Sequence, residues 1–277
     1  MTARSSPMPA LYAVWLDRPD LLFAEILAEV GVDVVILDGE HGAFSDEGLW
    51  EILGTTRALG LRSFVRVPEL VRSRVMQPLD WGADAVIIPG IETTAQAAEA
   101  VGYAQYPPDG QRGWGPRRPA LHRRAREDRT ALISEQRHRC PIWVQIETTP
   151  AVESIAEISS IRGLGGILVG PNDLAGDLGV LDDLNHPALN AAIDKVVRTA
   201  VEAEVPVGVV EPAANEDRLQ ARRDAGCSLI SVGTQLSMMY EAIAQRVSTV
   251  REQLSSTGNV DRQPSGPTHP PDATTKP

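Results

Sequence analysis

Two carboxylates follow neighbouring apolar runs that have the length of buried strands. Glu147 comes directly after Ile142–Ile146, and Asp173 comes shortly after the next such run, Gly166–Val169. In a parallel β/α barrel, consecutive strands lie side by side and end at one mouth, so these carboxylates are expected to lie close together. Carboxylate oxygens completed by water suit a hard divalent cation: Mg2+, Mn2+ or Co2+. Either residue alone would as readily cap a helix or join a loop ion pair, but their joint position predicts a metal site.

A histidine, an aspartate and an arginine follow two earlier apolar runs and suit acid–base and anion chemistry. His41 lies three residues after Asp38, whose carboxylate would orient the imidazole through its second ring nitrogen. Arg66 stands at the end of the following run, where its guanidinium would neutralise an enolate or a carboxylate. A solvated imidazole and a surface ion pair are the structural alternatives, and position alone does not decide between them and catalysis.

The segment after Gly166–Val169 also has the composition of an anion-binding turn. Gly170 and Pro171 favour a turn before a helix, and the backbone N–H groups of Asn172 and Asp173 stand at the helix start. Such N–H groups have no partner within the helix and can donate to a substrate carboxylate. A turn without a ligand is the alternative.

Lysine content excludes one large class of carbon–carbon bond chemistry. The chain has two lysines, Lys195 in a segment with helical spacing and Lys276 in the C-terminal tail. Neither is placed to reach a barrel interior and form an imine with a carbonyl substrate. We therefore expect no Schiff-base lysine and no pyridoxal phosphate, and metal-assisted chemistry is favoured.

Eight apolar, β-rich runs recur along the chain with helix-period segments between them. Strands that are apolar on both faces are typical of parallel sheets covered by helices, and eight of them in about 250 residues predict a (β/α)8 TIM barrel. The expected strands are Leu11–Leu16, Asp33–Leu37, Arg62–Val67, Ala85–Pro89, Ile142–Ile146, Gly166–Val169, Val207–Val210 and Leu229–Val232. Helical spacing is found in Leu21–Val30, Asp46–Leu59, Thr93–Tyr103, Pro187–Glu204 and Glu216–Ala225.

We expect this barrel to form one domain over residues 10–253. The segment 106–139, after the fourth strand, is far longer than an ordinary βα loop, and a lid and a subunit contact are both open for it. Residues 256–277 are rich in Ser, Thr, Pro and Gly without periodicity, which predicts a disordered tail.

Bulk properties narrow the class of partner. The net charge of -11 and the pI near 5.0 argue against nucleic-acid binding, because phosphate contacts need clustered cations. No apolar run approaches the roughly 18 residues that span a bilayer, so no membrane association is expected. Two cysteines, Cys140 and Cys227, cannot form a disulfide framework, which fits a reduced cytoplasmic setting.

Five motifs together resemble the HpcH/HpaI family of class II pyruvate aldolases. They occur in the family's order and spacing within about residues 10 to 250. The motifs are Leu37–Gly42, Val65–Pro68, Tyr106–Gly113, Val144–Thr148 and Val169–Leu174.

The resemblance implies a divalent metal held by Glu147 and Asp173, with Gln145 beside them. It implies that the substrates are a pyruvate-type 2-oxo acid and an aldehyde, with Arg66 stabilising the enolate. His41, oriented by Asp38, would act as the acid–base group.

Further contacts are implied by the same resemblance. The segment Gly170–Asp173 would hold the substrate carboxylate through its amides, and Trp15 would line the pocket, with barrel core as its alternative. Relatives assemble as homo-oligomers, trimers or hexamers, so Asp80 is expected to serve the site of an adjacent protomer.

Three other functions stay open at this point. An oxaloacetate decarboxylase or condensing enzyme would use the same enolate, and an acyl-CoA ester lyase of the same superfamily would need a nucleotide groove. A non-enzymatic scaffold would be expected to have a damaged set of polar residues, whereas every matched position is intact.

Overall fold

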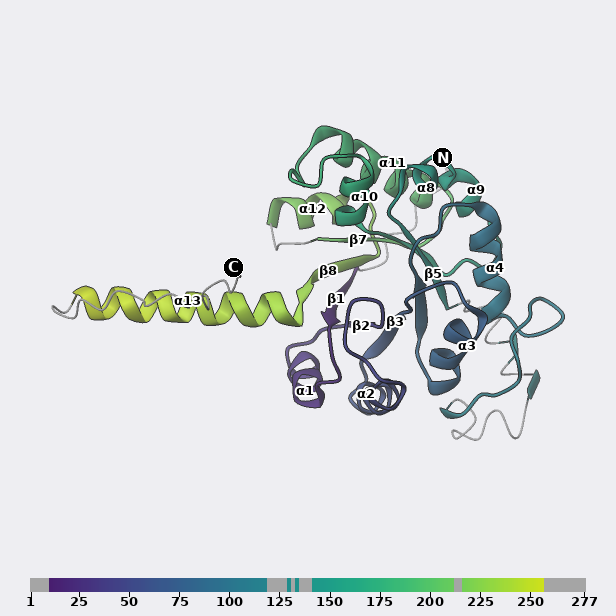
Figure 1. Cartoon of the computed structure of the whole chain (residues 1–277), viewed down its shortest axis with the longest axis horizontal. Coiled ribbons are helices and arrows are strands. Elements are labelled where there is room, and N and C mark those ends of the chain that lie inside the picture. Colours follow the sequence, from purple (N-terminus) through teal and green to yellow (C-terminus); the bar gives the residue numbers. More distant parts are fainter. Residues whose placement is uncertain (1–9, 119–128, 131–132, 135–140, 212–215, 257–277) are drawn as a thin grey trace, which may run out of the picture. The chain divides into compact units, whose positions relative to one another are not determined.

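The computed structural model describes residues 10–118, 129–130, 133–134, 141–211 and 216–256. Its strands form one closed parallel barrel in which each strand pairs with the next and β8 pairs with β1 (Figure 1). The strands are β1 (Leu11–Leu16), β2 (Val34–Asp38), β3 (Arg62–Arg66), β4 (Ala85–Ile88), β5 (Ile142–Ile146), β6 (Gly166–Val169), β7 (Val207–Val210) and β8 (Leu229–Thr234). The predicted (β/α)8 barrel is confirmed, and all eight expected strands are present.

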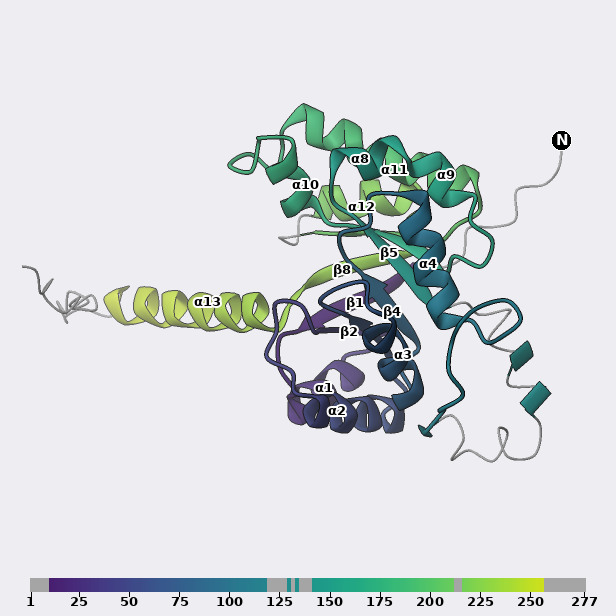
Figure 2. The same ribbon diagram turned by 45° about the vertical axis from the view of Figure 1, so that its right-hand side comes forward.

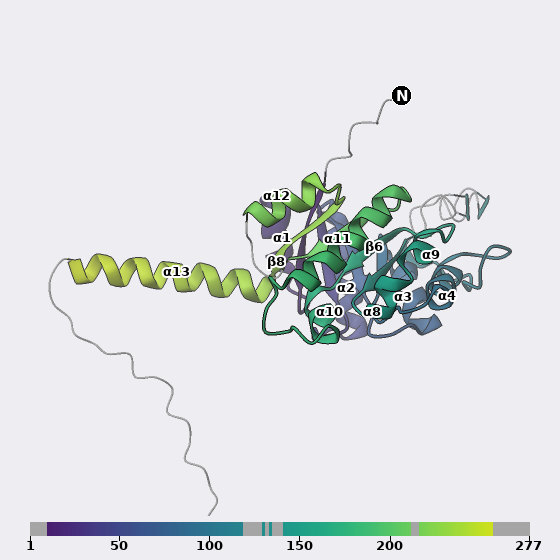
Figure 3. The same ribbon diagram turned by 90° about the horizontal axis from the view of Figure 1, so that it is seen from above.

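Helices surround the strands of the barrel in each view (Figures 2 and 3). Their first turns are fixed by local capping: the Asp20, Ser45 and Thr93 side chains accept backbone N–H groups three residues ahead. The described helices are α1 (Leu21–Glu29), α2 (Asp46–Ala58), α3 (Arg72–Trp81), α4 (Thr94–Ala104), α8 (Thr149–Glu153), α9 (Ile155–Ser159), α10 (Pro171–Asp177), α11 (Pro187–Glu202), α12 (Glu216–Asp224) and α13 (Gln235–Ser256).

The barrel interior is filled by side chains rather than left as a channel. Phe64 and Trp143 lie with ring centroids 5.5 Å apart, and Gly166 on the neighbouring strand leaves the space that the Trp143 indole occupies. The inner cluster consists of Ala13, Trp15, Val34, Ile36, Phe64, Ala85, Ile87, Trp143, Leu168 and Leu229. This packed floor leaves the carboxyl ends of the strands as the place for polar chemistry.

The first part of the connection after β4 and α4 packs on α3. Arg72 donates two hydrogen bonds, of 3.1 and 2.6 Å, to the carbonyl of Gln111, and Arg112 pairs with Asp80 at 2.8 Å. Tyr106 and Trp114 stack with centroids 5.1 Å apart. Most of residues 119–140 lie outside the described residues, so both the lid and the subunit contact stay predictions.

The chain consists of two compact units, residues 1–236 and residues 237–277. The second unit contains most of α13, along which apolar residues recur at spacings of three and four, as in Tyr240, Ile243, Val247, Val250 and Leu254. No described helix is both long and apolar enough to cross a membrane. The domain limits 10–253 stay a prediction, and the predicted disordered tail lies almost wholly outside the described residues.

Substituting Gly166→Ala is expected to destabilise the barrel by about 1–3 kcal/mol, because the new methyl group would overlap the Trp143 indole. Urea denaturation measures the loss. The matched control is Gly102→Ala in α4, where an added methyl group meets nothing within 4 Å. That change should stabilise by up to about 1 kcal/mol. Equal unfolding midpoints for the two variants would contradict the packing of the barrel interior.

Candidate active site

A buried ion pair joins the ends of β2 and β3. The strand register places Asp38 opposite Arg66. Arg66 Nε donates to Asp38 Oδ1 at 3.0 Å and its terminal nitrogen Nη2 donates to Oδ2 at 2.8 Å, a two-point pair with both residues buried. The next residue is Gly39, whose N–H donates to the Arg66 carbonyl at 2.8 Å. A Cβ there would lie 2.6 Å from that oxygen, so the close approach requires glycine.

The Asp38 carboxylate also holds the turn that carries the histidine. Its Oδ1 accepts the backbone N–H groups of Glu40, at 3.1 Å, and of His41, at 3.2 Å. The structure therefore differs from the expectation that Asp38 orients the imidazole through a ring nitrogen. The reason is that Arg66 and the turn occupy both carboxylate oxygens, and the His41 side chain is 66% exposed.

Glu40 belongs to this cluster although the sequence reasoning gave it no role. Its Oε2 lies 3.0 Å from Arg66 Nη1 and 4.0 Å from His41 Nε2. Burial raises the pKa of the Glu40 carboxyl, while the charges of Arg66 and His41 act to lower it. A Glu directly before a candidate acid–base histidine was the available signal for this contact.

Trp15 lies under the same guanidinium. The Arg66 guanidinium carbon is 4.7 Å from the centroid of the Trp15 ring, and the buried indole Nε1 donates to Ser231 Oγ at 3.0 Å. The expected pocket position of Trp15 and its alternative as barrel core both apply, because it also belongs to the inner apolar cluster. Ser231 on β8 was missed by the sequence reasoning, since a lone serine in a strand carries no signal.

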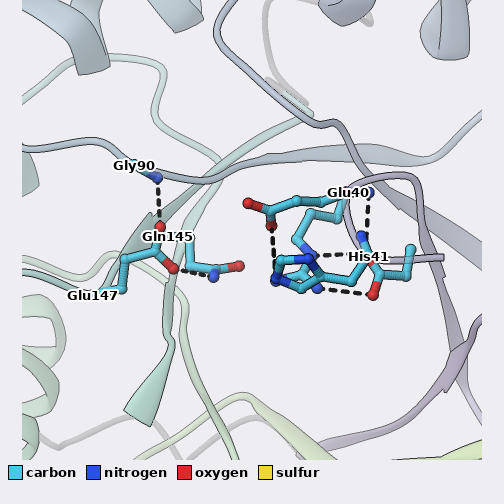
Figure 4. Close-up of polar contacts among 7 residues, drawn as sticks. Glu40, His41, Gly90, Gln145 and Glu147 are labelled. Carbon is cyan, nitrogen blue, oxygen red and sulfur yellow. Dashed lines mark hydrogen bonds and ion pairs between the residues drawn. The ribbon is translucent and has the colours of Figure 1, made fainter. Parts of the chain in front are cut away.

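A second polar group lies at the ends of β5 and β6. Glu147 Oε1 accepts the Gly90 N–H at 2.6 Å, and Gln145 Nε2 donates to Glu147 Oε2. Figure 4 shows these three residues as one set of contacts and Glu40 with His41 as another. Gln145 Oε1 is buried and has no hydrogen-bond partner. A Cβ at Gly170 would lie 3.1 Å from both Gln145 Nε2 and Glu147 Oε2, so the glycine leaves space beside these polar atoms.

A cavity of about 290 Å³ brings most of the expected residues together. Glu147 is not part of its lining and lies against Gly170 and Gln145 instead. Asp80 is outside the cavity, paired with Arg112. The lining residues are Trp15, Asp38, His41, Arg66, Gln145, Gly170, Pro171, Asn172, Asp173, Val210 and Thr234.

The donor set fits a hard divalent cation that keeps positions for other ligands. Within the described parts of the chain, no three His, Cys, Asp or Glu side chains gather into a metal-binding group. Mg2+-type ions are commonly held by one or two carboxylates, with water and substrate oxygens completing the shell. Glu147 and Asp173 would supply the carboxylates, and the unpartnered Gln145 oxygen would be a further hard donor.

Comparison with known proteins identifies the family. The model of the family described as HpcH/HpaI aldolase/citrate lyase matches residues 11–242. The chain belongs to this family. The predicted family and the prediction of an enzyme are thereby confirmed.

Relatives agree over most of the chain. A 2-keto-3-deoxy-L-rhamnonate aldolase of Klebsiella pneumoniae is 30% identical over 237 residues, covering 84% of this chain and 86% of that protein. A structure of an HpcH/HpaI aldolase/citrate lyase family protein from Burkholderia cenocepacia J2315 is 31% identical, with a TM-score of 0.80, covering 88% of this chain and 95% of its own. The HpcH/HpaI aldolase from Desulfitobacterium hafniense DCB-2 is 27% identical, with a TM-score of 0.80 and coverages of 88% and 93%.

Replacing Arg66 with Met is expected to lower the free energy of unfolding by roughly 3–5 kcal/mol, because two carboxylates would lose their buried counter-charge. The control Arg74→Met breaks the exposed Arg74–Asp46 pair, 3.4 Å long, and should change stability by less than about 0.5 kcal/mol. Urea unfolding of both variants compares them. Similar losses in the two variants would show that the buried pair does not organise the barrel mouth.

Proposed function

We propose that this protein is a metal-dependent aldolase that forms or cleaves aldols between the enolate of a pyruvate-type 2-oxo acid and an aldehyde. The observation that carries the proposal is the cavity itself, where Arg66 and His41 share one space with Gln145 and Asp173. The cavity thus joins a cationic group, an acid–base group and oxygen donors for a metal. The family and the rhamnonate aldolase relatives support this reaction class.

Glu147 and Asp173 would hold the metal, which we propose to be Mg2+, Mn2+ or Co2+. When bound, the cation would act as a Lewis acid toward the keto and carboxylate oxygens of the 2-oxo acid. Gln145 orients the Glu147 carboxylate through its amide N–H, and its own amide oxygen, Oε1, has no hydrogen-bond partner. Gly90 fixes the other Glu147 oxygen, so the carboxylate is held before any ligand arrives.

The substrate carboxylate would bind at the start of α10. Pro171 is at the first helical position and has no N–H, so the N–H groups of Asn172 and Asp173 are the first donors there. Gly170 has no side chain to block the approach from the Gln145 side. These contacts would fix the 2-oxo acid with its methyl or methylene carbon free to react.

Arg66 and His41 would then handle charge and protons. The guanidinium would stabilise the negative charge that develops on the enolate oxygen, because Asp38 and Trp15 hold it rigidly at the cavity wall. His41, exposed and within the cavity lining, would move the proton between solvent and the reacting carbon or the aldol hydroxyl.

We further propose a cytoplasmic homo-oligomer, a trimer or a hexamer, in which Asp80 serves a neighbouring site. The position of Asp80 outside the cavity of its own chain fits that role. The apolar face along α13 is typical of helices that pack against another surface.

The first test is exchange of the pyruvate methyl protons in D2O, followed by NMR with metal-free protein and with added Mg2+, Mn2+ or Co2+. Exchange that needs a metal supports enolate formation and leaves the aldehyde to be found by screening. Absence of exchange with every metal would overturn pyruvate as the nucleophile. Oxaloacetate decarboxylation and acyl-CoA ester cleavage, tested on the same protein, would then decide for the alternative enzymes.

Glu147→Gln and Asp173→Asn are each expected to abolish metal-dependent exchange, because each removes one ligand charge from the metal site. The fold should survive, since both replacements keep the shape of the side chain. The control is Glu153→Gln, the same change at an exposed position in α8, which should keep full exchange. Isothermal titration of Mn2+ into the three variants measures metal affinity directly. Wild-type affinity in Glu147→Gln and Asp173→Asn would exclude these ligands.

A further inference from the structure

Arg66 is held along both of its edges by carboxylates of one short turn. Asp38 takes Nε and Nη2, and Glu40 Oε2 lies 3.0 Å from the remaining nitrogen, Nη1. Trp15 covers one face of the guanidinium plane. Asp38 and Trp15 already fix the guanidinium plane, so the Glu40 carboxylate adds a second negative charge at the Nη1 end.

The same Glu40 oxygen is the nearest ionic partner of the His41 ring within the described residues. The two atoms lie 4.0 Å apart, too long for a hydrogen bond and short enough for charge attraction when the imidazole is protonated. Asp38 is not a rival partner, because its oxygens bind Arg66 and the turn N–H groups. The charged groups that act on Glu40 are Arg66, His41, Glu147 and Asp38.

These contacts close a ring of interactions around the arginine. Asp38 binds the guanidinium with its side chain and the backbone of Glu40 with the same carboxylate, and Glu40 returns its own side chain to the guanidinium. His41 follows directly in the chain, so its backbone is held by the ring and its imidazole faces the Glu40 carboxylate. The position of the proposed acid–base group thereby depends on the proposed enolate-stabilising group.

We infer that Glu40 is a positioning residue that couples Arg66 to His41. Its carboxylate places one negative charge beside both the guanidinium end Nη1 and the imidazole. Glu40 does not line the cavity, so it acts through these two residues and not on the substrate. This inference rests on the aldolase function proposed above, but part of its test is independent of turnover.

The decisive variant is Glu40→Gln, which keeps the side-chain shape and an oxygen beside Arg66 Nη1 but removes the charge. The control is Glu47→Gln, the same charge change at an exposed position on α2. The His41 imidazole pKa is followed by NMR in both proteins, with the signal assigned by its loss in His41→Asn. We expect the His41 pKa to fall in Glu40→Gln and to stay at the wild-type value in Glu47→Gln. An unchanged His41 pKa in Glu40→Gln overturns the inference.

Kinetics of pyruvate methyl exchange separate the two roles of Glu40. In Glu40→Gln, kcat should fall by roughly tenfold, part of the usual contribution of a general base, while KM stays near the wild-type value because a side chain of the same shape still packs against Arg66. In Glu40→Ala both constants should worsen, since Arg66 loses that contact as well. Equal losses of kcat in Glu40→Gln and Glu47→Gln would overturn the coupling.

The variant Asp80→Asn tests whether Asp80 of an adjacent protomer, and not Glu40, is the partner of the His41 imidazole. If the His41 pKa falls in Asp80→Asn and not in Glu40→Gln, the imidazole is paired across a subunit boundary and the inference fails. Failure of the aldolase proposal looks different: the wild-type protein would then show no exchange with any metal, while the His41 titration would still decide the role of Glu40.

Discussion

The site depends on one parallel register, which sets an aspartate beside an arginine at the ends of β2 and β3. Two buried charges cost solvation energy, and their attraction repays it only when the geometry is close to ideal and the other polar atoms are satisfied. Asp38 and Arg66 meet that condition through two direct hydrogen bonds and the backbone donors of the following turn. Gly39 lets the turn pass close to the Arg66 carbonyl, where a side chain would not fit. The pair is better understood as a device that fixes positions than as a source of stability.

The pairing of β1 with β8 places Trp15 beside the Asp38–Arg66 pair. Their register shifts between Ala13 and Trp15, and Gly233 takes up the extra residue of β8 with a φ of 139° that other residues rarely adopt. The shift coincides with the position where the Trp15 indole reaches the Ser231 hydroxyl on one side and the Arg66 guanidinium on the other. A local irregularity in the sheet therefore connects the first, third and eighth strands at the mouth.

The order of strands and their polar ends could be predicted because both follow from periodicity and from a rule of parallel barrels. The contacts between side chains could not. Glu40 contacts Arg66 because the turn folds back toward β3. The Asp38 carboxylate binds Arg66 instead of the His41 ring. Ser231 has no neighbour in sequence that hints at Trp15. Rotamers and competition for donors are three-dimensional properties, so residue types and spacing give the members of a site but not their pairing.

Charge balance ties the two halves of the site together. Asp38 and Glu40 pair with the Arg66 guanidinium. Asp173 in the cavity lining and Glu147 beside Gly170 add two further carboxylates, so the ligand-free site would repel an anionic 2-oxo acid. A divalent cation held by Glu147 and Asp173, as proposed above, would remove most of that repulsion, and burial already raises the pKa of the Glu40 carboxyl. The excess of carboxylates is therefore an independent reason to expect a metal here. With the proposed cation bound, the site could bind an anion without a lysine, because the positive charge would come from Arg66 and the cation.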